Sequence, residues 1–118
     1  MDAKKETKDF EKFSFDYLGK PLEIKAETCK GFWSQFIGKM FSRDKEPIIF
    51  EFNKLVLAGI HMLFVFMPLL VVWFDADKNV TKMRIMKPFT SFDKAYAKYV
   101  LEIPMGNKII ANFEQFED

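Results

Sequence analysis

Cysteine and histidine are almost absent from this 118-residue sequence, which contains one of each, Cys29 and His61. A single cysteine excludes an internal disulfide and every zinc or iron–sulfur motif that needs a pair of cysteines. We therefore expect Cys29 to pack as a small buried apolar side chain. A chain without disulfides is typical of a reducing compartment, which favours a cytoplasmic location.

An excess of either charge is also absent, because 18 Lys and Arg residues face 17 Asp and Glu residues and the formal net charge is +1. Acidic and basic residues are interspersed, so the chain as a whole produces no field that would concentrate nucleic acid or anionic lipid. The composition therefore argues against a nucleic-acid partner. No glycine-rich phosphate loop, serine-elbow motif or paired Cys/His cluster occurs, and we expect no cofactor and no bound metal.

The N-terminus lacks an apolar run of signal-peptide length, which agrees with a cytoplasmic protein. Residues 1–9 are charged and poor in apolar side chains, so we expect a flexible leader there. The remaining residues, 10–118, are enough for one domain with its own hydrophobic core. The most abundant unusual residue is phenylalanine, with 15 copies. Aromatic side chains favour strands over helices, so the composition indicates a β-rich fold.

Alternation of apolar and polar side chains predicts most of the strands. A turn at Gly19–Pro21 would join the first two strands into a hairpin, and Asn53–Lys54 would form another turn. Thr28 can cap a short helix that ends near Gly38. Ser91 can cap a helical turn that continues to Ala97. The expected strands cover residues 13–17, 22–26, 48–52, 81–85 and 99–103, and residues 108–118 fit a strand or a short helix.

A stretch of 20 residues from Leu55 to Phe74 contains no charged side chain. Its length would suit a transmembrane helix. Pro68 would break such a helix at depth, and His61 and Gly59 also argue against it. Pro68 divides the stretch into two runs rich in Val, Phe, Trp and Leu, so we predict two buried strands, at residues 61–66 and 69–74.

Asp75, Asp77 and Asn79 have the spacing of the first half of a calcium-binding loop. The glycine and the bidentate acid that such a loop needs are replaced by Val80 and Met86. We therefore predict an ordinary hairpin loop, in which the Asp side chains bond their own backbone and Asn79 adopts the left-handed conformation.

An ordered set of short segments extends from about Phe13 to Gly106. After the first hairpin it comprises Ala26-Glu-Thr28, Gly38–Phe41, Arg43, Ile48–Phe52, Ile60-His-Met62, Pro68, Asp75–Val80, Lys87-Pro88 and Val100–Gly106. This set resembles the domain-of-unknown-function 192 family. The resemblance implies the fold class α+β, β-rich, with a single small barrel or jelly-roll-like sheet and one short helix. It implies no established activity.

This chain departs from the family pattern after Met62, where many members have Lys, Asn and Thr but this sequence has Leu63, Phe64 and Val65. Leu69-Leu70 replaces a hydrophobic–Asp pair. The expected family site is therefore apolar here, and we predict a non-catalytic binding or interaction module with an apolar, aromatic-rich pocket or surface. Its partner would be a small apolar ligand, a protein or a second copy of the chain. The candidate binding residues are His61, Met62, Phe64, Leu70, Lys87 and Glu102.

Two alternatives remain open. The first is a small hydrolase-like enzyme that uses His61 with the carboxylate of Glu102 or Asp75, which requires those groups to share one cleft. Glu102 stands where the family has a recurrent Glu, and a contact with Lys87 or His61 could shift its pKa. The second is a membrane-associated protein that uses residues 55–74.

Lys82, Arg84 and Lys87 form a basic strip, which we expect to be a solvated outer face.

Overall fold

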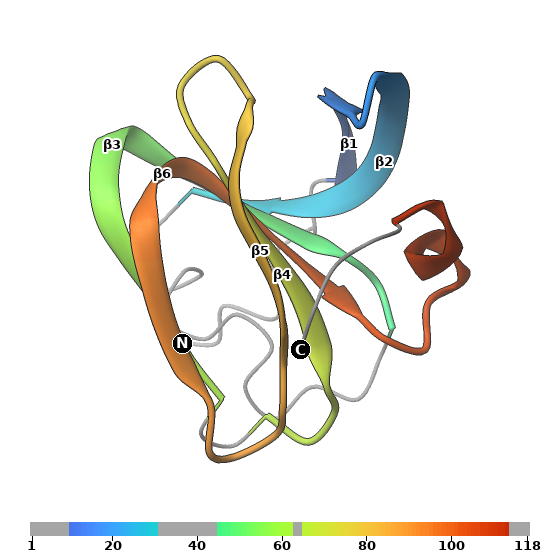
Figure 1. Ribbon diagram of the computed structural model, residues 1–118, viewed down its shortest axis with the longest axis vertical. Helices are drawn as coiled ribbons and strands as arrows, with labels where there is room; N and C mark the ends of the chain where they lie inside the picture. The colour runs from blue at the N-terminus through green and yellow to red at the C-terminus, as the bar shows by residue number, and fades with distance from the viewer. Residues whose placement is uncertain (1–9, 31–44, 63–64, 114–118) are drawn as a thin grey trace, which may run out of the picture.

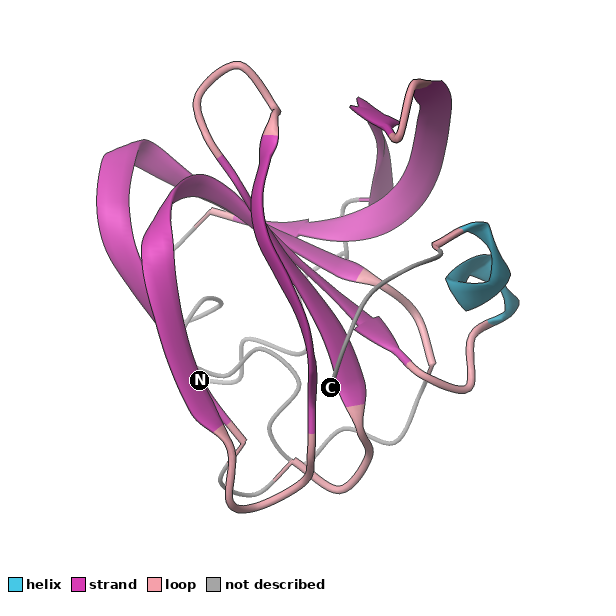
Figure 2. Ribbon diagram, viewed as in Figure 1, coloured by secondary structure: helices cyan, strands magenta, loops and turns pink. Residues whose placement is uncertain are grey.

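The computed structural model describes residues 10–30, 45–62 and 65–113; residues 1–9, 31–44, 63–64 and 114–118 lie outside that description. The described chain forms one six-stranded sheet in the order β1-β2-β3-β6-β4-β5. A short 3-10 helix, η2, follows the last strand (Figure 2). The elements are β1 (Phe10–Tyr17), β2 (Lys20–Cys29), β3 (Ile48–His61), β4 (Leu69–Phe74), β5 (Val80–Met86), β6 (Phe92–Pro104) and η2 (Lys108–Asn112).

The sheet is mixed and curls into a half-barrel (Figure 1). β2 and β3 pair in parallel over three residues each, Glu27–Cys29 with Ile48–Phe50, and all other neighbouring strands are antiparallel. The predicted β-rich class with a barrel-like sheet is therefore confirmed. The helix predicted to begin at Thr28 is wrong at its start, because Thr28 and Cys29 belong to β2. The rest of that predicted helix lies outside the described residues.

The first hairpin forms where alternation predicted it. Phe13, Phe15 and Tyr17 of β1 are buried, while the residues between them face solvent. The turn is one residue earlier than expected, because Leu18 and Gly19 both have positive φ, 52° and 81°. Two such residues form the tight turn whose twist suits an antiparallel hairpin. Consecutive strands can therefore pair directly across this turn.

The centre of the sheet is covered on both faces. All six residues of β4 are buried. Leu70, Val72 and Phe74 belong to one apolar cluster, and Leu69, Val71 and Trp73 belong to a second cluster on the opposite face. A strand buried on both faces is expected to be continuously apolar, which explains the uncharged run before Asp75. The strand predicted at residues 69–74 is confirmed.

The other half of the uncharged stretch differs from the prediction. β3 continues through the expected turn at Asn53–Lys54 and ends at His61, so residues 55–61 extend a long strand. Met62, Val65 and Phe66 are not in a strand, and the prediction for residues 61–66 was wrong at these positions. Residues 55–74 therefore do not form one apolar helix. Within the described residues, the structure contains no helix with the length and apolarity needed to span a membrane.

Two smaller predictions also fail. Phe92 to Ala97 belong to β6 and not to a helical turn capped by Ser91, because these residues pair with β3 over the register from His61 to Val56. The left-handed residue of the β4–β5 loop is Lys78, with φ 66°, and not Asn79. The undecided segment after Gly106 forms the 3-10 helix η2 over Lys108–Asn112.

β3 and β6 extend together beyond the rest of the sheet and curve as a pair (Figure 1). We call residues 53–61 of β3 and 92–98 of β6 the arm. The ladder shifts register between Glu51 and Val56, at the base of the arm. β2 pairs with β3 only as far as Phe50, so within the described chain the arm part of β3 has a ladder neighbour on one side alone.

Candidate functional site

Two of the residues predicted to bind a partner lie in the core. Met62 and Leu70 have no exposed surface, and Leu70 packs in the cluster under the first hairpin. The Met62 backbone connects two loops, since its N–H donates to Ser91 O and its carbonyl accepts from Phe89 and Val65 N–H. Phe64 lies outside the described residues. The apolar residues that suggested a binding patch are therefore core residues where the structure describes them.

The register of β3 and β6 separates His61 from Glu102. His61 pairs with Phe92 at one end of the ladder, whereas Glu102 pairs with Ile48 at the other. Ten residues of β6 separate these positions, on the order of 30 Å along the strand. Glu102 is buried, with 5% of its surface exposed, between Ile48 and Val71. The register therefore does not bring together His61 and Glu102, one of the two pairs that the hydrolase hypothesis allows.

Lys87 has a different environment from Glu102. It is exposed directly after β5, and its backbone N–H donates to Ser91 Oγ at 2.9 Å. This contact closes the turn before β6. A contact between Lys87 and Glu102 was one possibility that the sequence left open, but Lys87 is at the surface and Glu102 is buried in the central strand.

The Asp75 loop bonds to itself, as predicted. Oδ1 of Asp75 accepts from the backbone N–H groups of Asp77 and Asn79, each at 2.9 Å, and Oδ2 accepts from Asn79 Nδ2. The hydrogen bond from the Asn79 backbone is the main reason that the pKa of Asp75 is lowered. A carboxylate held in this way is a poor general base. The described residues contain no group of three His, Cys, Asp or Glu side chains that could hold a metal ion.

Two members of the basic strip form ion pairs with Asp93 of the arm. Lys82 Nζ donates to Asp93 Oδ1 at 2.6 Å, and Arg84 Nη1 donates to Asp93 Oδ2 at 2.8 Å. Burial of the Asp93 carboxyl raises its pKa, but the hydrogen bonds from Lys82 and Arg84 outweigh this and lower the pKa to about 2. These two cations, each 38% exposed, therefore hold β5 against the arm and remain partly in contact with solvent.

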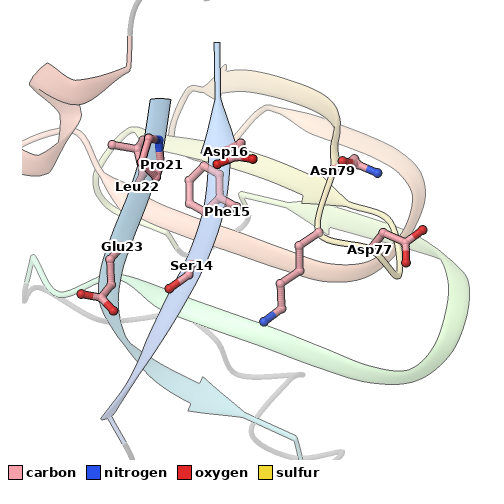
Figure 3. Close-up of a pocket in the computed structure, with 9 residues that line it drawn as sticks. Ser14, Phe15, Asp16, Pro21, Leu22, Glu23, Asp77 and Asn79 are labelled. Atoms are coloured by element: carbon pink, nitrogen blue, oxygen red, sulfur yellow. The ribbon is translucent and has the colours of Figure 1, made fainter. Parts of the chain in front are cut away.

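An open groove of about 510 Å³ lies between the first hairpin and the β4–β5 loop (Figure 3). Asp16 and Glu23 come from the hairpin, and Asp77 and Asn79 come from the loop. The loop's Lys78 places its ammonium 5.0 Å from the ring centroid of Phe13, in a cation–π contact. The sequence did not predict this groove, because its two walls come from distant parts of the chain. Its lining is Ser14, Phe15, Asp16, Pro21, Leu22, Glu23, Asp77, Lys78 and Asn79.

The outer face of the arm exposes large apolar side chains. The exposed fractions are 51% for Leu55, 49% for Leu57, 58% for Phe92 and 63% for Tyr96. Leu57 pairs directly with Tyr96 across the ladder, so these side chains share a face. Val56, Ala58 and Ala97 point to the opposite face, where they join the second cluster. We call Leu55, Leu57, Gly59, Phe92, Lys94 and Tyr96 the arm face.

Gly59 provides space for one of these rings. A Cβ atom at Gly59 would lie 3.4 Å from Cε1 and Cζ of Phe92, so the ring rests directly over the glycine. The Phe92 ring is therefore supported by the backbone of β3 while most of its other side faces solvent.

Two aromatic side chains next to the arm contact each other. The rings of Phe66 and Phe89 meet edge to face, with centroids 5.5 Å apart, and Phe89 is 51% exposed. Phe89 has a φ of 70°, which is unusual for a bulky residue. The hydrogen bond from Phe89 N–H to Met62 O holds this loop against the end of β3. The loop before β6 and the segment after Met62 therefore also expose apolar rings.

The chain belongs to the DUF192 family, described as Uncharacterized ACR, whose model matches residues 16–112. Residues 16–112 include both the β3–β6 arm and the β4–β5 loop. The family assignment from the ordered segments is therefore confirmed. Like the sequence resemblance, it supplies no activity.

Similar proteins agree with this assignment. UPF0127 protein PF1050 from Pyrococcus furiosus is 29% identical over 91 residues, which cover 75% of this chain and 78% of that protein. A protein of unknown function from Novosphingobium aromaticivorans has a similar structure, with a TM-score of 0.75 and 20% identity, over 87% of this chain and 77% of the other. A "putative transcription regulator" from Sinorhizobium meliloti has a TM-score of 0.71 and 16% identity, over 84% and 81%. At these identities the two structures show a shared fold alone.

Proposed function

We propose that this protein is a non-catalytic binding module and that the arm face is its contact surface. The observation that carries the proposal is the gathering of Leu57, Phe92 and Tyr96, each about half exposed or more, on one face of two paired strands, with the exposed Leu55 close before them in β3. Single exposed apolar residues are common on soluble proteins. A contiguous apolar patch is not, and such patches usually mark contact sites.

The burial energy that the exposed apolar side chains of the arm face forgo supports the same proposal. Leaving a large apolar side chain half exposed forgoes on the order of 1 kcal/mol of burial energy. Within the described chain, the arm part of β3 also has one edge without a ladder partner, and Lys54 is the only charged residue of this part. Proteins usually protect such edges with charges, prolines or covering segments. A partner that covers the arm would remove both costs together.

The groove under the first hairpin fits the predicted apolar pocket less well. Its lining includes Asp16, Glu23 and Asp77, which are all exposed, and the apolar Phe15 at its wall is buried. We therefore place the contact surface on the arm. We retain the cytoplasm as the proposed location, on the basis of the lone buried Cys29 and the cysteine content of the chain.

Site-specific photo-crosslinking in cells tests this function. A benzophenone amino acid replaces Tyr96 in one variant and the exposed Lys25 of β2 in a control variant. We expect a discrete adduct from the Tyr96 position alone, and we expect Leu57→Asp in the same chain to abolish it. Equal adducts from both positions, or none from either, would show that the arm face is not a contact surface.

A further inference from the structure

Aromatic and basic side chains alternate on the outer face of β6. Successive residues of a strand point to opposite faces, and Ala97 points inward, where it is completely buried. Phe92, Lys94 and Tyr96 therefore face outward together. Phe92 and Tyr96 are separated by about 13 Å along the strand, with Lys94 midway between them. This arrangement combines flat apolar rings with a cation on one exposed sheet surface.

The arm carries more basic than acidic residues. Residues 53–61 and 92–98, which form the arm, contain three basic residues, Lys54, Lys94 and Lys98, and one acidic residue, Asp93. Lys82 and Arg84 bond Asp93, so its charge is already neutralised. Within the described part of the chain, no ion pair includes Lys54, Lys87 or Lys94. The other basic residue, Lys98, lies 3.7 Å from Glu51 at the base of the arm.

The net charge of +1 conceals this local excess. The arm contains Lys54, Lys94 and Lys98, whereas the groove between the first hairpin and the β4–β5 loop is lined by Asp16, Glu23 and Asp77 as well as Lys78. Because exposed charges act over about 8–10 Å at physiological salt, a ligand at the arm responds to the arm's own charge. The net charge of the whole chain therefore does not exclude a nucleic-acid partner for this one surface.

We propose that the arm face binds single-stranded nucleic acid, with bases stacked on Phe92 and Tyr96 and phosphates beside Lys94. This inference rests on the proposed function, because it names the partner of the same surface. Non-specific single-strand binding combines exposed aromatic rings with a basic surface that follows the phosphates. The Phe92 ring is held over Gly59 before any ligand arrives, which reduces the entropy lost on stacking.

Single strands fit this surface better than duplex. The bases of a duplex are stacked on one another, so their faces are not available to protein rings, whereas the bases of a single strand are. An acidic protein segment would satisfy the lysines without requiring two flat rings four residues apart. The three lysines without an ion pair imply a shallow salt dependence, with log K falling by roughly 2 per tenfold increase in salt.

Fluorescence anisotropy with labelled oligonucleotides tests this proposal. The probes are oligo-dT and oligo-U of about 12 nucleotides and a duplex of the same length, at about 50 mM salt. We expect both single strands to bind more tightly than the duplex. Phe92→Ala and Tyr96→Ala should each weaken binding roughly 5- to 100-fold, while Tyr96→Phe, which keeps the ring, should bind as the wild type does.

Charge controls separate stacking from general attraction. Lys94→Glu should weaken binding strongly, whereas Lys25→Glu makes the same charge change on β2 and should have less than a twofold effect. Equal loss in both lysine variants, or no loss in the two ring-removing variants, would refute the proposal. Thermal unfolding of each variant confirms that it is folded.

The outcomes also separate this inference from the proposed function. If Tyr96 gives a specific protein adduct in cells and no oligonucleotide binds, the arm is a contact surface for protein and the nucleic-acid inference fails alone. If neither a specific adduct nor oligonucleotide binding is found, both proposals fail.

Discussion

The carboxylate of Asp93 on β6 lies 2.6 Å from Nζ of Lys82 on β5, although these two strands are not neighbours in this region of the sheet. β4 lies between them in the strand order, and its ladder with β6 extends only from Pro104 to Tyr99. The arm part of β6 therefore reaches β5 through side chains. Arg84 adds a second contact at 2.8 Å, so two ion pairs close this side of the half-barrel.

Asp93→Asn should destabilise the protein in a pH-dependent way. The folded-state pKa of Asp93, about 2, is below the ordinary value of 3.8. The stabilisation is therefore present above about pH 4 and is lost as the pH falls through about 2. The side chains of Lys82 and Arg84 are each 38% exposed, so solvent screening reduces the expected loss at neutral pH to about 1 kcal/mol.

Urea denaturation from neutral pH to about pH 2 measures this effect. The difference between wild type and Asp93→Asn should shrink as the pH falls. Asp77→Asn, in an exposed loop, is the control and should change stability little at any pH. A difference that stays constant over the whole range would contradict the ion-pair explanation.

Trp73→Phe should loosen the arm as well as the core. Nε1 of Trp73 donates to the carbonyl of Ala58 in the arm at 3.0 Å, in a buried site. Phenylalanine cannot donate, so the carbonyl loses its side-chain partner and the unfolding free energy should fall by about 1–3 kcal/mol. Hydrogen exchange should then accelerate in residues 53–61. Val72→Ala, on the opposite face of β4, should destabilise the protein without that local acceleration.

Leu70→Ala and Leu57→Ala should have opposite consequences, although both residues come from the same uncharged stretch. Leu70 has no exposed surface, so its truncation should cost about 2–5 kcal/mol in unfolding free energy. Leu57 is 49% exposed, and its truncation should cost less than about 1 kcal/mol. Chemical denaturation measures both. The Leu57 variant should instead reduce crosslinking from the Tyr96 position, and a large loss of stability in it would mean that the arm face is core.

Asn107→Ala should remove two contacts at the start of η2. Its Oδ1 accepts from Ile109 N–H at 2.8 Å, and its Nδ2 donates to the carbonyl of Lys45 at 2.7 Å. The loss should be about 1–2 kcal/mol, because both a cap and a connection to a distant loop disappear. Asn107→Ser keeps an oxygen that can cap but loses the donor to Lys45. Its thermal unfolding midpoint should therefore lie between those of wild type and Asn107→Ala.

Local patterns in the sequence were sufficient to predict two kinds of strand. One kind is buried on one face and exposed on the other, and the other kind is buried on both faces. Alternation located β1, since every second residue from Phe13 to Tyr17 is buried, and continuous apolarity located β4. The self-bonded Asp75 loop was also predictable, because its donors and acceptors lie within four residues of one another. The ordered segments identified the family for the same reason, as each is local.

The ends of the long strands were not predictable from local sequence. Asn53–Lys54 has the composition of a turn, yet both residues continue β3, because the β6 strand pairs on both sides of this point. In the same way, Phe92 to Ala97 form a strand and not a helix because they pair with β3. Pairing between residues about 40 positions apart overrides a weak local preference.

The sequence alone therefore determined the β-rich class, the family, the first hairpin and the buried β4 strand, since each depends on a periodic pattern within a few residues. Only the tertiary structure decided which apolar residues are core and which form a surface. Leu70 and Leu57 are identical in the sequence pattern, but one lies between two strands at the centre of the sheet and the other on the outside of the arm. It also decided that the arm is basic, because charge accumulates where distant strands are brought together.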